Sequence, residues 1–256
     1  RAEGSTFKFT IIADSHAQYN TRYQQAVQNI ISDNPDFHLD LGDTFMNDNT
    51  TSQAAVDNVY LAQRDPLYMD GIGHSAPIFL ASGNHENEEG WNFDDTPFSI
   101  ALGSVQARKA YFPTPNANDD QFYSANTDIL AAIDEATYGD EYRENYYAWT
   151  WGDALFVVID EFQYTMDLPY SPIAGEGSEP VTGDQWSWTL GKQQFNWFKE
   201  ILENNKEKKF KFVFSHHVTG GVPDASVSGG AGYVRGGAGA APYFEWGGKN
   251  ADGSWG

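Results

Sequence analysis

Short apolar runs alternate with longer amphipathic segments over the first third of the chain. Three runs rich in β-branched and aromatic residues predict strands, at residues 7–13, 37–41 and 77–81. Two segments with apolar side chains at helical spacing separate them, at residues 21–34 and 51–68. Asn34-Pro35 ends the first helix, because proline disfavours helical backbone in the residue before it. This β-α-β-α-β order predicts parallel strands joined by right-handed crossovers.

The rest of the chain carries strand and helix signals that are spaced less regularly. Residues 146–151 and 154–160 predict a hairpin that turns at Gly152-Asp153. A helix is expected at residues 192–205 and another strand at 210–215. We interpret 1–256 as a single domain with two irregular insertions and a glycine-rich loop, at about 87–145, 161–190 and 219–241.

A polar loop follows each of four strand-like runs. These loops contain Asp14-Ser15-His16, Gly42-Asp43, Gly83-Asn84-His85-Glu86 and Ser215-His216-His217. Because several strand ends can meet at one edge of a sheet, ligands that are distant in sequence gather there. Carboxylate, amide and imidazole side chains suit two divalent transition metals that share a carboxylate. This combination is typical of a metal-assisted phosphoester hydrolase.

The composition narrows the range of partners. A formal net charge of −21 and a pI of about 4.4 disfavour binding to long nucleic acids and to anionic membranes. A small phosphoester substrate is compatible with this charge, because bound cations reverse the local field. The absence of cysteine excludes disulfides and thiolate metal sites, and no apolar run approaches the roughly 18 residues of a membrane span. The N-terminal RAEGS is typical of a processed end, so we expect a mature secreted or periplasmic protein.

The order of the four loops resembles the motif order of the calcineurin-like metallophosphoesterase superfamily, which includes purple acid phosphatases and many phosphodiesterases. The family pattern runs D-x-H, G-D, G-N-H-[DE], a histidine that closes a strand, and G-H-x-H. This chain matches the first four between Asp14 and His217 and contains no G-H-x-H. The resemblance implies an α/β fold, a four-layer α/β/β/α sandwich with the metals at the strand ends. In the family a strand and G-H-x-H would follow, so we expect the C-terminal part of the sandwich to be missing here.

The resemblance also implies the metal ligands, which are Asp14, His16, Asp43, Asn84 and His216. Asp14 and His16 would bind the first metal. Asp43 would bridge both metals, because its two oxygens can each approach a cation. Asn84 and His216 would bind the second metal, with His217 as the alternative to His216, which directly follows the strand and Ser215.

The cofactors implied are two divalent or trivalent transition metal ions, and the sequence does not choose among iron, manganese and zinc. In the family, G-H-x-H supplies one histidine to each ion. We therefore expect weak metal binding by the chain of 256 residues. Two tightly held ions per chain in elemental analysis would contradict this expectation.

His85 is the candidate catalytic residue. By resemblance it faces the substrate, where it would protonate the leaving oxygen or stabilise the phosphoryl oxygens. Glu86 would orient His85. Arg235, in the glycine-rich loop, would contact a phosphate or remain a solvated arginine, and His217 is a further candidate for a supporting role. Three other polar residues are expected to bind no metal, namely His38, Asp40 and His74.

The reaction implied by the resemblance is hydrolysis of small phosphomonoesters or phosphodiesters. In it, two cations about 3.5–4 Å apart hold a bridging hydroxide that attacks phosphorus in line. Two alternatives stay open, a nuclease that acts on short polymers and a non-catalytic binding module that kept the fold and part of the metal site. The sequence selects neither the substrate nor the oligomeric state.

Overall fold

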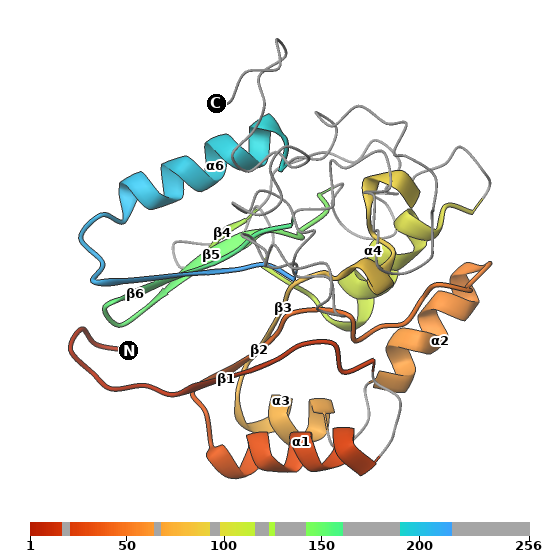
Figure 1. Ribbon diagram of the computed structural model, residues 1–256, viewed down its shortest axis with the longest axis horizontal. Helices are drawn as coiled ribbons and strands as arrows, with labels where there is room; N and C mark the ends of the chain where they lie inside the picture. The colour runs from red at the N-terminus through yellow and green to blue at the C-terminus, as the bar shows by residue number, and fades with distance from the viewer. Residues whose placement is uncertain are drawn as a thin grey trace, which may run out of the picture.

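The computed structural model describes residues 1–16, 21–63, 68–92, 98–115, 123–125, 142–160 and 190–216. In this part of the chain two β-sheets lie face to face, and helices lie on their outer sides (Figure 1). None of the helices described has both the length and the apolar character that crossing a bilayer requires.

The first sheet has the parallel strand order β1-β2-β3. Its strands are β1 (Phe9–Ile12), β2 (Phe37–Asp40) and β3 (Ile78–Leu80). The intervening helices are α1 (Thr21–Asp33), α2 (Gln53–Gln63), the π-helix η1 (Tyr68–Ile72) and the short α3 (Gly73–Ser75). Ile12 pairs with Asp40, and Asp40 pairs with Leu80, so the three strands end at one edge. The predicted element order and parallel pairing are confirmed.

The second sheet has the strand order β4-β5-β6-β7. Its strands are β4 (Tyr123–Ala125), β5 (Tyr147–Trp151), β6 (Ala154–Val158) and β7 (Phe210–Phe214). The first three pair in antiparallel fashion, and β7 runs parallel to β6. Gly152, in the β5–β6 turn, has a φ of 58°, a left-handed conformation that glycine adopts without a Cβ clash. The predicted hairpin and final strand are confirmed.

Aromatic side chains fill the space between the two sheets. Phe37 and Phe79 of the first sheet face Trp149 and Phe156 of the second, and all four are buried. The ring centroids are 3.9 Å apart for Phe79 and Trp149 and 5.0 Å apart for Phe37 and Phe156. Such rings each bury about 150–250 Å² and dominate core energetics. Aromatic side chains therefore make up much of the core between the sheets.

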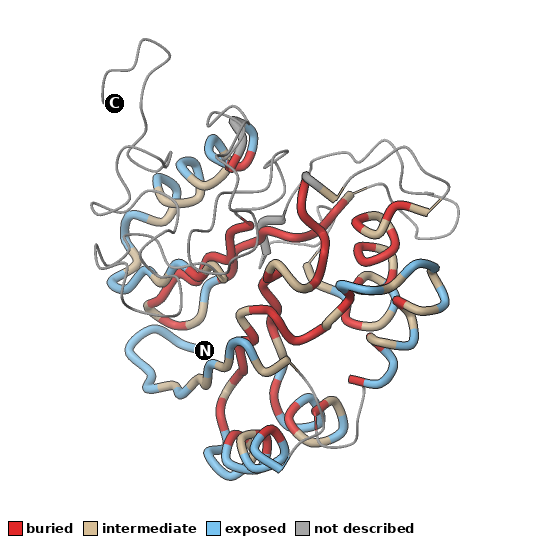
Figure 2. The backbone as a smooth tube through the Cα atoms, turned by 45° about the vertical axis from the view of Figure 1, so that its right-hand side comes forward, coloured by how far each residue is buried: buried red, intermediate tan, exposed pale blue. Residues whose placement is uncertain are grey.

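Helices complete the outer layers of the sandwich. Val27 of α1 and Tyr60 of α2 share a buried cluster with Leu80 of β3. On the other sheet, α6 (Gly191–Asn204) places Ile201 against a buried cluster that contains Leu155 of β6. Buried positions are concentrated in β2, β3, β5 and β6, whereas much of the outward surface of the helices is exposed (Figure 2). The predicted α/β/β/α fold class is confirmed.

The predicted insertion at 87–145 contains a helix that hydrophobic periodicity does not reveal. It is α4 (Ile100–Tyr111), preceded by two short 3₁₀ turns, η2 (Asn84–Glu86) and η3 (Gly90–Asn92). The buried residues of α4 are Ala101, Gly103, Ser104, Val105, Ala107 and Arg108. Apart from Val105 these side chains are small or polar, so the apolar period is weak. The segments 161–189 and 217–256 lie outside the described residues, and the insertion at 161–190 and the loop at 219–241 stay predictions.

His38 of β2 is fully buried between the strands and the helices, in line with the structural role expected for it. Its Nδ1 lies 2.8 Å from Thr10 Oγ1 on the neighbouring strand, where the two residues are register partners. Burial lowers the pKa of His38 to about 4, and the contact with Thr10 only partly opposes this shift. His38 therefore stays neutral in the folded protein when the unfolded chain already binds a proton.

This shift predicts a loss of stability in acid. Because the folded pKa lies below the unfolded value of 6.5, the unfolded state binds more protons as the pH falls from about 6.5 to 4. Between pH 7 and about pH 4.5, we expect the wild type to lose about 2–3 kcal/mol more unfolding free energy than His38→Asn. Urea denaturation of both proteins at the two pH values measures this difference. An identical pH dependence for the two proteins would contradict the burial argument.

Candidate metal centre

The loops after β1, β2, β3 and β7 converge at one edge of the sandwich. Among the described residues, two groups of side chains place potential ligand atoms within 4.8 Å of one another. One group is His16, Asp43 and His85, and the other is Asp14, Asp43 and His216. Asp43 belongs to both groups. A mixed carboxylate and imidazole donor set with one shared carboxylate fits two transition metal ions.

Asp43 lies at the centre of this arrangement. Its Oδ2 is 3.9 Å from His16 Nε2, 3.9 Å from His85 Nε2 and 3.4 Å from His216 Nε2. Burial on its own would raise the pKa of Asp43, but the contact with His216 and the N–H of His85 lower it overall. The Asp43 carboxylate is therefore ionised at neutral pH, which is the form that binds a cation.

His216 reaches the centre from the end of β7. Its Nδ1 lies 2.8 Å from the carbonyl oxygen of Leu41. Because a carbonyl can only accept a hydrogen bond, Nδ1 carries a proton, and Nε2 is the nitrogen that faces Asp43. Such a backbone contact on the far nitrogen is the usual way to orient a metal-binding imidazole. The structure thus places His216, favoured from sequence, in the cluster, whereas the alternative His217 lies outside the described residues, as does Arg235.

Asn84 is the first residue of η2 and directly precedes His85 in the third loop. Its side chain is half-buried. It comes from the same turn as His85, which lies in one of the two ligand groups. Its role as a ligand of the second metal stays a prediction.

The ligand residues hold unusual backbone conformations. Asp14, His16 and Asp43 have φ values of 52°, 45° and 56°. Non-glycine residues reach this left-handed region at a cost of about 1–3 kcal/mol, and such residues cluster at functional sites. Two hydrogen bonds keep the first loop on the second: Asp14 N–H donates to Gly42 O at 3.0 Å, and His16 N–H donates to Asp43 O at 2.8 Å.

Two glycines allow the second and third loops to touch. A Cβ on Gly42, which has a φ of 95°, would lie 2.3 Å from the backbone nitrogen of Gly83. A Cβ on Gly83 would lie 2.3 Å from Asp43 Oδ1. Real Cβ atoms do not approach other heavy atoms so closely, so both positions require glycine. Gly42 of the G-D motif and Gly83 of the G-N-H motif therefore allow the same close contact, which is the one between the second and third ligand loops.

Glu86 does not orient His85, contrary to the expectation from sequence. Its carboxylate is buried and accepts the N–H groups of Asp43, Thr44, Phe45 and Gly83 at 2.9, 2.8, 2.8 and 2.6 Å. Neighbouring residues in a 3₁₀ turn project about 120° apart, so Glu86 points inward while His85 faces the centre. Burial raises the pKa of Glu86 to about 7, with a further contribution from the Asp43 charge, while N–H donors oppose the rise.

Asp48 is the partner of His85 that sequence reasoning missed. Asp48 Oδ1 lies 2.7 Å from His85 Nδ1, and both side chains are partly exposed. The His85 backbone is fixed as well, because its N–H donates to Asp43 Oδ1 at 2.9 Å. Asp48 lies five residues after Asp43 in the same polar loop. No motif in the sequence distinguishes Asp48 from the other polar residues of this loop.

Asp40 lies beneath the centre and belongs to neither ligand group. Its carboxylate accepts the Gly42 N–H at 3.1 Å, the Thr44 hydroxyl at 2.8 Å and the Tyr68 hydroxyl at 2.9 Å. Burial raises the pKa of Asp40 to about 6, although these three donors oppose the rise. His74, also expected to bind no metal, is exposed on α3.

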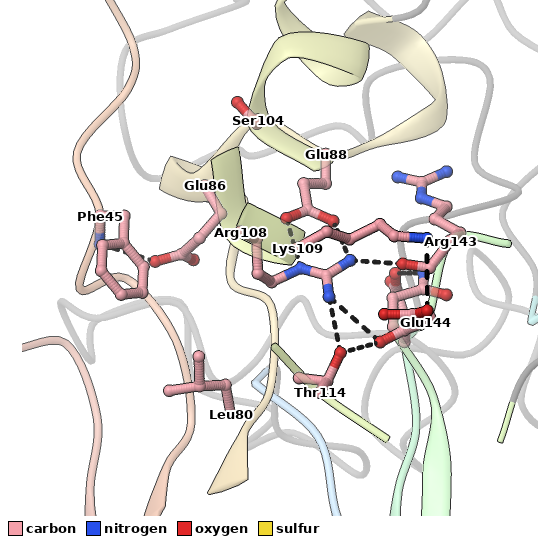
Figure 3. Close-up of polar contacts among 12 residues, drawn as sticks. Phe45, Leu80, Glu86, Glu88, Ser104, Arg108, Lys109, Thr114, Arg143 and Glu144 are labelled. Atoms are coloured by element: carbon pink, nitrogen blue, oxygen red, sulfur yellow. Dashed lines mark hydrogen bonds and ion pairs between the residues drawn. The ribbon is translucent and has the colours of Figure 1, made fainter. Parts of the chain in front are cut away.

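A buried ionic network supports the chain that leaves the third loop (Figure 3). Arg108 of α4 donates from Nε and Nη2 to the two carboxylate oxygens of Glu88, at 2.8 and 2.9 Å. The same guanidinium donates to the carbonyl oxygens of Arg143 and Glu144 at 2.6 and 3.1 Å. The residues that follow His85 are thereby tied both to α4 and to the segment that enters β5.

This chain is similar to solved structures and matches the model of one protein family. A crystal structure of a dimetal phosphatase from Danio rerio is similar with a TM-score of 0.44 and 15% sequence identity, covering 83% of this chain and 70% of that one. No curated protein matches the sequence. A family model described as calcineurin-like phosphoesterase matches residues 7–249, which include all the loops of the centre. The chain therefore belongs to the calcineurin-like phosphoesterase family.

Proposed function

We propose that the protein hydrolyses small phosphomonoesters or phosphodiesters with two transition metal ions. Family membership supports metal-dependent phosphoester hydrolysis as the general chemistry. The observation that carries the proposal is the position of Asp43, which belongs to both ligand groups. A carboxylate shared between two sets of ligands is the arrangement that a two-metal site requires.

The resemblance assigns Asp14 and His16 to one ion and Asn84 and His216 to the other, with Asp43 shared. The structure groups Asp14 with His216, and His16 with His85, around the same Asp43 carboxylate. Together Asp14, His16, Asp43, Asn84 and His216 would hold the two ions. When bound, the ions would lower the pKa of water and neutralise charge on the phosphoryl oxygens. The donor set suits iron, manganese or zinc. The chain itself supplies orientation, because the Leu41 carbonyl and the left-handed backbone of three ligands fix where the donor atoms point.

His85 completes the site as the proton donor to the leaving oxygen. With Nδ1 bound to Asp48, the ring presents Nε2 on the side of Asp43, where a phosphoester would lie. Asp48 is a positioning residue in this scheme, since it contacts the imidazole and none of the ligand groups includes it. Partial exposure of both side chains leaves the pair open to a substrate.

Asp48→Asn tests the pairing. We expect kcat to fall about 10–100-fold on an ester with a poor leaving group, because partners that orient functional side chains typically contribute this much. Metal content and KM should change little. Steady-state kinetics with an alkyl phosphate measure the effect, and Asp33→Asn, an exposed carboxylate at the end of α1, is the matched control. Equal kcat values for Asp48→Asn and the wild type would contradict the pairing.

Metal-dependent turnover is the test of the function itself. Chelator-treated protein should be inactive on small aryl phosphomonoesters and phosphodiesters, and millimolar Mn²⁺ should restore hydrolysis. Phosphate binding without turnover in any metal would instead favour the non-catalytic module. The net charge of −21 leads us to propose that long nucleic acids are not substrates. Salt-stimulated cleavage of polymeric DNA would support the nuclease alternative.

A further inference from the structure

We propose that Glu86 is a positioning residue that fixes the Asp43 carboxylate and joins the second and third ligand loops. The inference rests on the proposed function for the role of Asp43 as the shared ligand. The contacts of Glu86 with the backbone are independent of that role.

Glu86 is the acceptor for four backbone donors. Its Oε1 accepts the N–H groups of Thr44 and Phe45, both at 2.8 Å. Its Oε2 accepts those of Asp43 at 2.9 Å and Gly83 at 2.6 Å. The side chain is 2% exposed, and its carboxylate points toward the backbone of Phe45 (Figure 3). Without this carboxylate, these N–H groups would be buried without an acceptor, which is strongly unfavourable.

The clamp, meaning the four hydrogen bonds that Glu86 accepts, acts on the turn at residues 42–45. Asp43 has a φ of 56°, and Gly42 a φ of 95°, so two successive residues adopt left-handed backbone. Three successive N–H groups, from Asp43 to Phe45, consequently point to one side, where Glu86 accepts them. Asp43 Oδ1 is then placed to accept the N–H of His85, which links the shared ligand to the third loop.

A second buried carboxylate holds the same turn from beneath. Asp40 accepts the Gly42 N–H and the Thr44 hydroxyl, and it is anchored to the helical layer by Tyr68. Asp40 constrains the start of the turn, whereas Glu86 also accepts the N–H of Gly83. Glu86 thus joins the turn to the third loop, a connection that Asp43 reinforces by accepting the N–H of His85.

Glu88 provides a matched control. It is two residues further along the same loop and is 1% exposed, so its burial is equivalent to that of Glu86. Its carboxylate binds the Arg108 guanidinium and not the turn at Asp43. Glu86→Gln and Glu88→Gln therefore make the same chemical change at two buried sites, and only the first alters the clamp.

Amide hydrogen exchange of the metal-free protein tests the clamp directly. In Glu86→Gln an amide N–H₂ replaces one carboxylate oxygen, so two backbone donors lose their acceptor. We expect the amides of residues 43–45 and Gly83 to exchange at least about tenfold faster relative to those of β2. In Glu88→Gln this ratio should stay at the wild-type value. Unchanged local exchange in Glu86→Gln would overturn the proposal.

A second variant covers the case in which Glu86→Gln does not fold. Glu86→Asp keeps the charge but is one methylene shorter, so it cannot reach both loops, and the same local increase in exchange is expected. Wild-type exchange in folded Glu86→Asp would then overturn the proposal.

Titration with Mn²⁺ gives the functional readout. The affinity should fall at least about tenfold in Glu86→Gln, as for other residues that orient ligands, and stay near the wild-type value in Glu88→Gln. Wild-type affinity in folded Glu86→Gln would overturn the role of Glu86 in positioning the ligand. A wild-type protein that binds no Mn²⁺ would contradict the proposed function. The exchange measurement would still show whether Glu86 protects the amides of residues 43–45 and Gly83.

Discussion

Asp43→Asn is expected to abolish both metal binding and turnover. The amide has one neutral oxygen and one N–H₂ donor, so it cannot offer an oxygen to each of two cations. The change also removes the negative charge that faces His16, His85 and His216. Loss of a residue that merely orients a ligand costs about 10–100-fold, so loss of the shared ligand should exceed a hundredfold in kcat/KM.

Elemental analysis of protein equilibrated with millimolar Mn²⁺, and initial rates on the same preparations, measure these effects. Asp33→Asn is the control for loss of one negative charge, because Asp33 is exposed at the end of α1. An Asp43→Asn protein that keeps its metal content and its rate would show that Asp43 is not the shared ligand.

His85→Ala is expected to separate catalysis from metal binding. The variant should keep its metal content, since the donors assigned to the two ions are all retained. On an alkyl phosphate, kcat should fall about 10²–10⁴-fold, the usual contribution of general acid catalysis. The decrease should be much smaller on a nitrophenyl ester, because that leaving group departs without protonation.

Comparison of the two substrates and of the metal content distinguishes the possible roles of His85. His74→Ala is the matched control, because His74 is an exposed histidine on α3, outside both ligand groups. Loss of metal in His85→Ala would make His85 a ligand, as its place in the group with His16 and Asp43 also allows. Full activity on the alkyl phosphate would contradict the role of proton donor.

Much of the fold could be predicted because its strands are short, apolar and bounded by clear turn signals. β1, β2 and β3 lie within the predicted strands, and the β5–β6 hairpin turns at the predicted glycine. α4 was not predictable in this way, since its buried side includes Gly103, Ser104 and Arg108. Its burial depends on partners that are distant in sequence, such as Glu88 and the carbonyl of Glu144.

The candidate site also has features that could be predicted from the sequence and features that could not. The loops of Asp14 and Asp43 were predictable neighbours, because the parallel strands β1 and β2 end together. The arrival of His216 was predicted from motif order, since it follows β7 of the second sheet. The partner of His85 was not predictable, since the position of Asp48 depends on how the loop after β2 folds back. The inward direction of Glu86 depends on the 3₁₀ geometry of η2, which a linear motif does not contain.

If two metal ions share Asp43, both should be visible beside its carboxylate in crystals soaked in millimolar Mn²⁺. Anomalous diffraction from such crystals should give two peaks about 3.5–4 Å apart, one on each side of the Asp43 carboxylate. One of these peaks should lie beside Asp14 and His16, and the other should lie beside Asn84 and His216. A single peak, or peaks that do not contact Asp43, would contradict a dinuclear centre built on this residue.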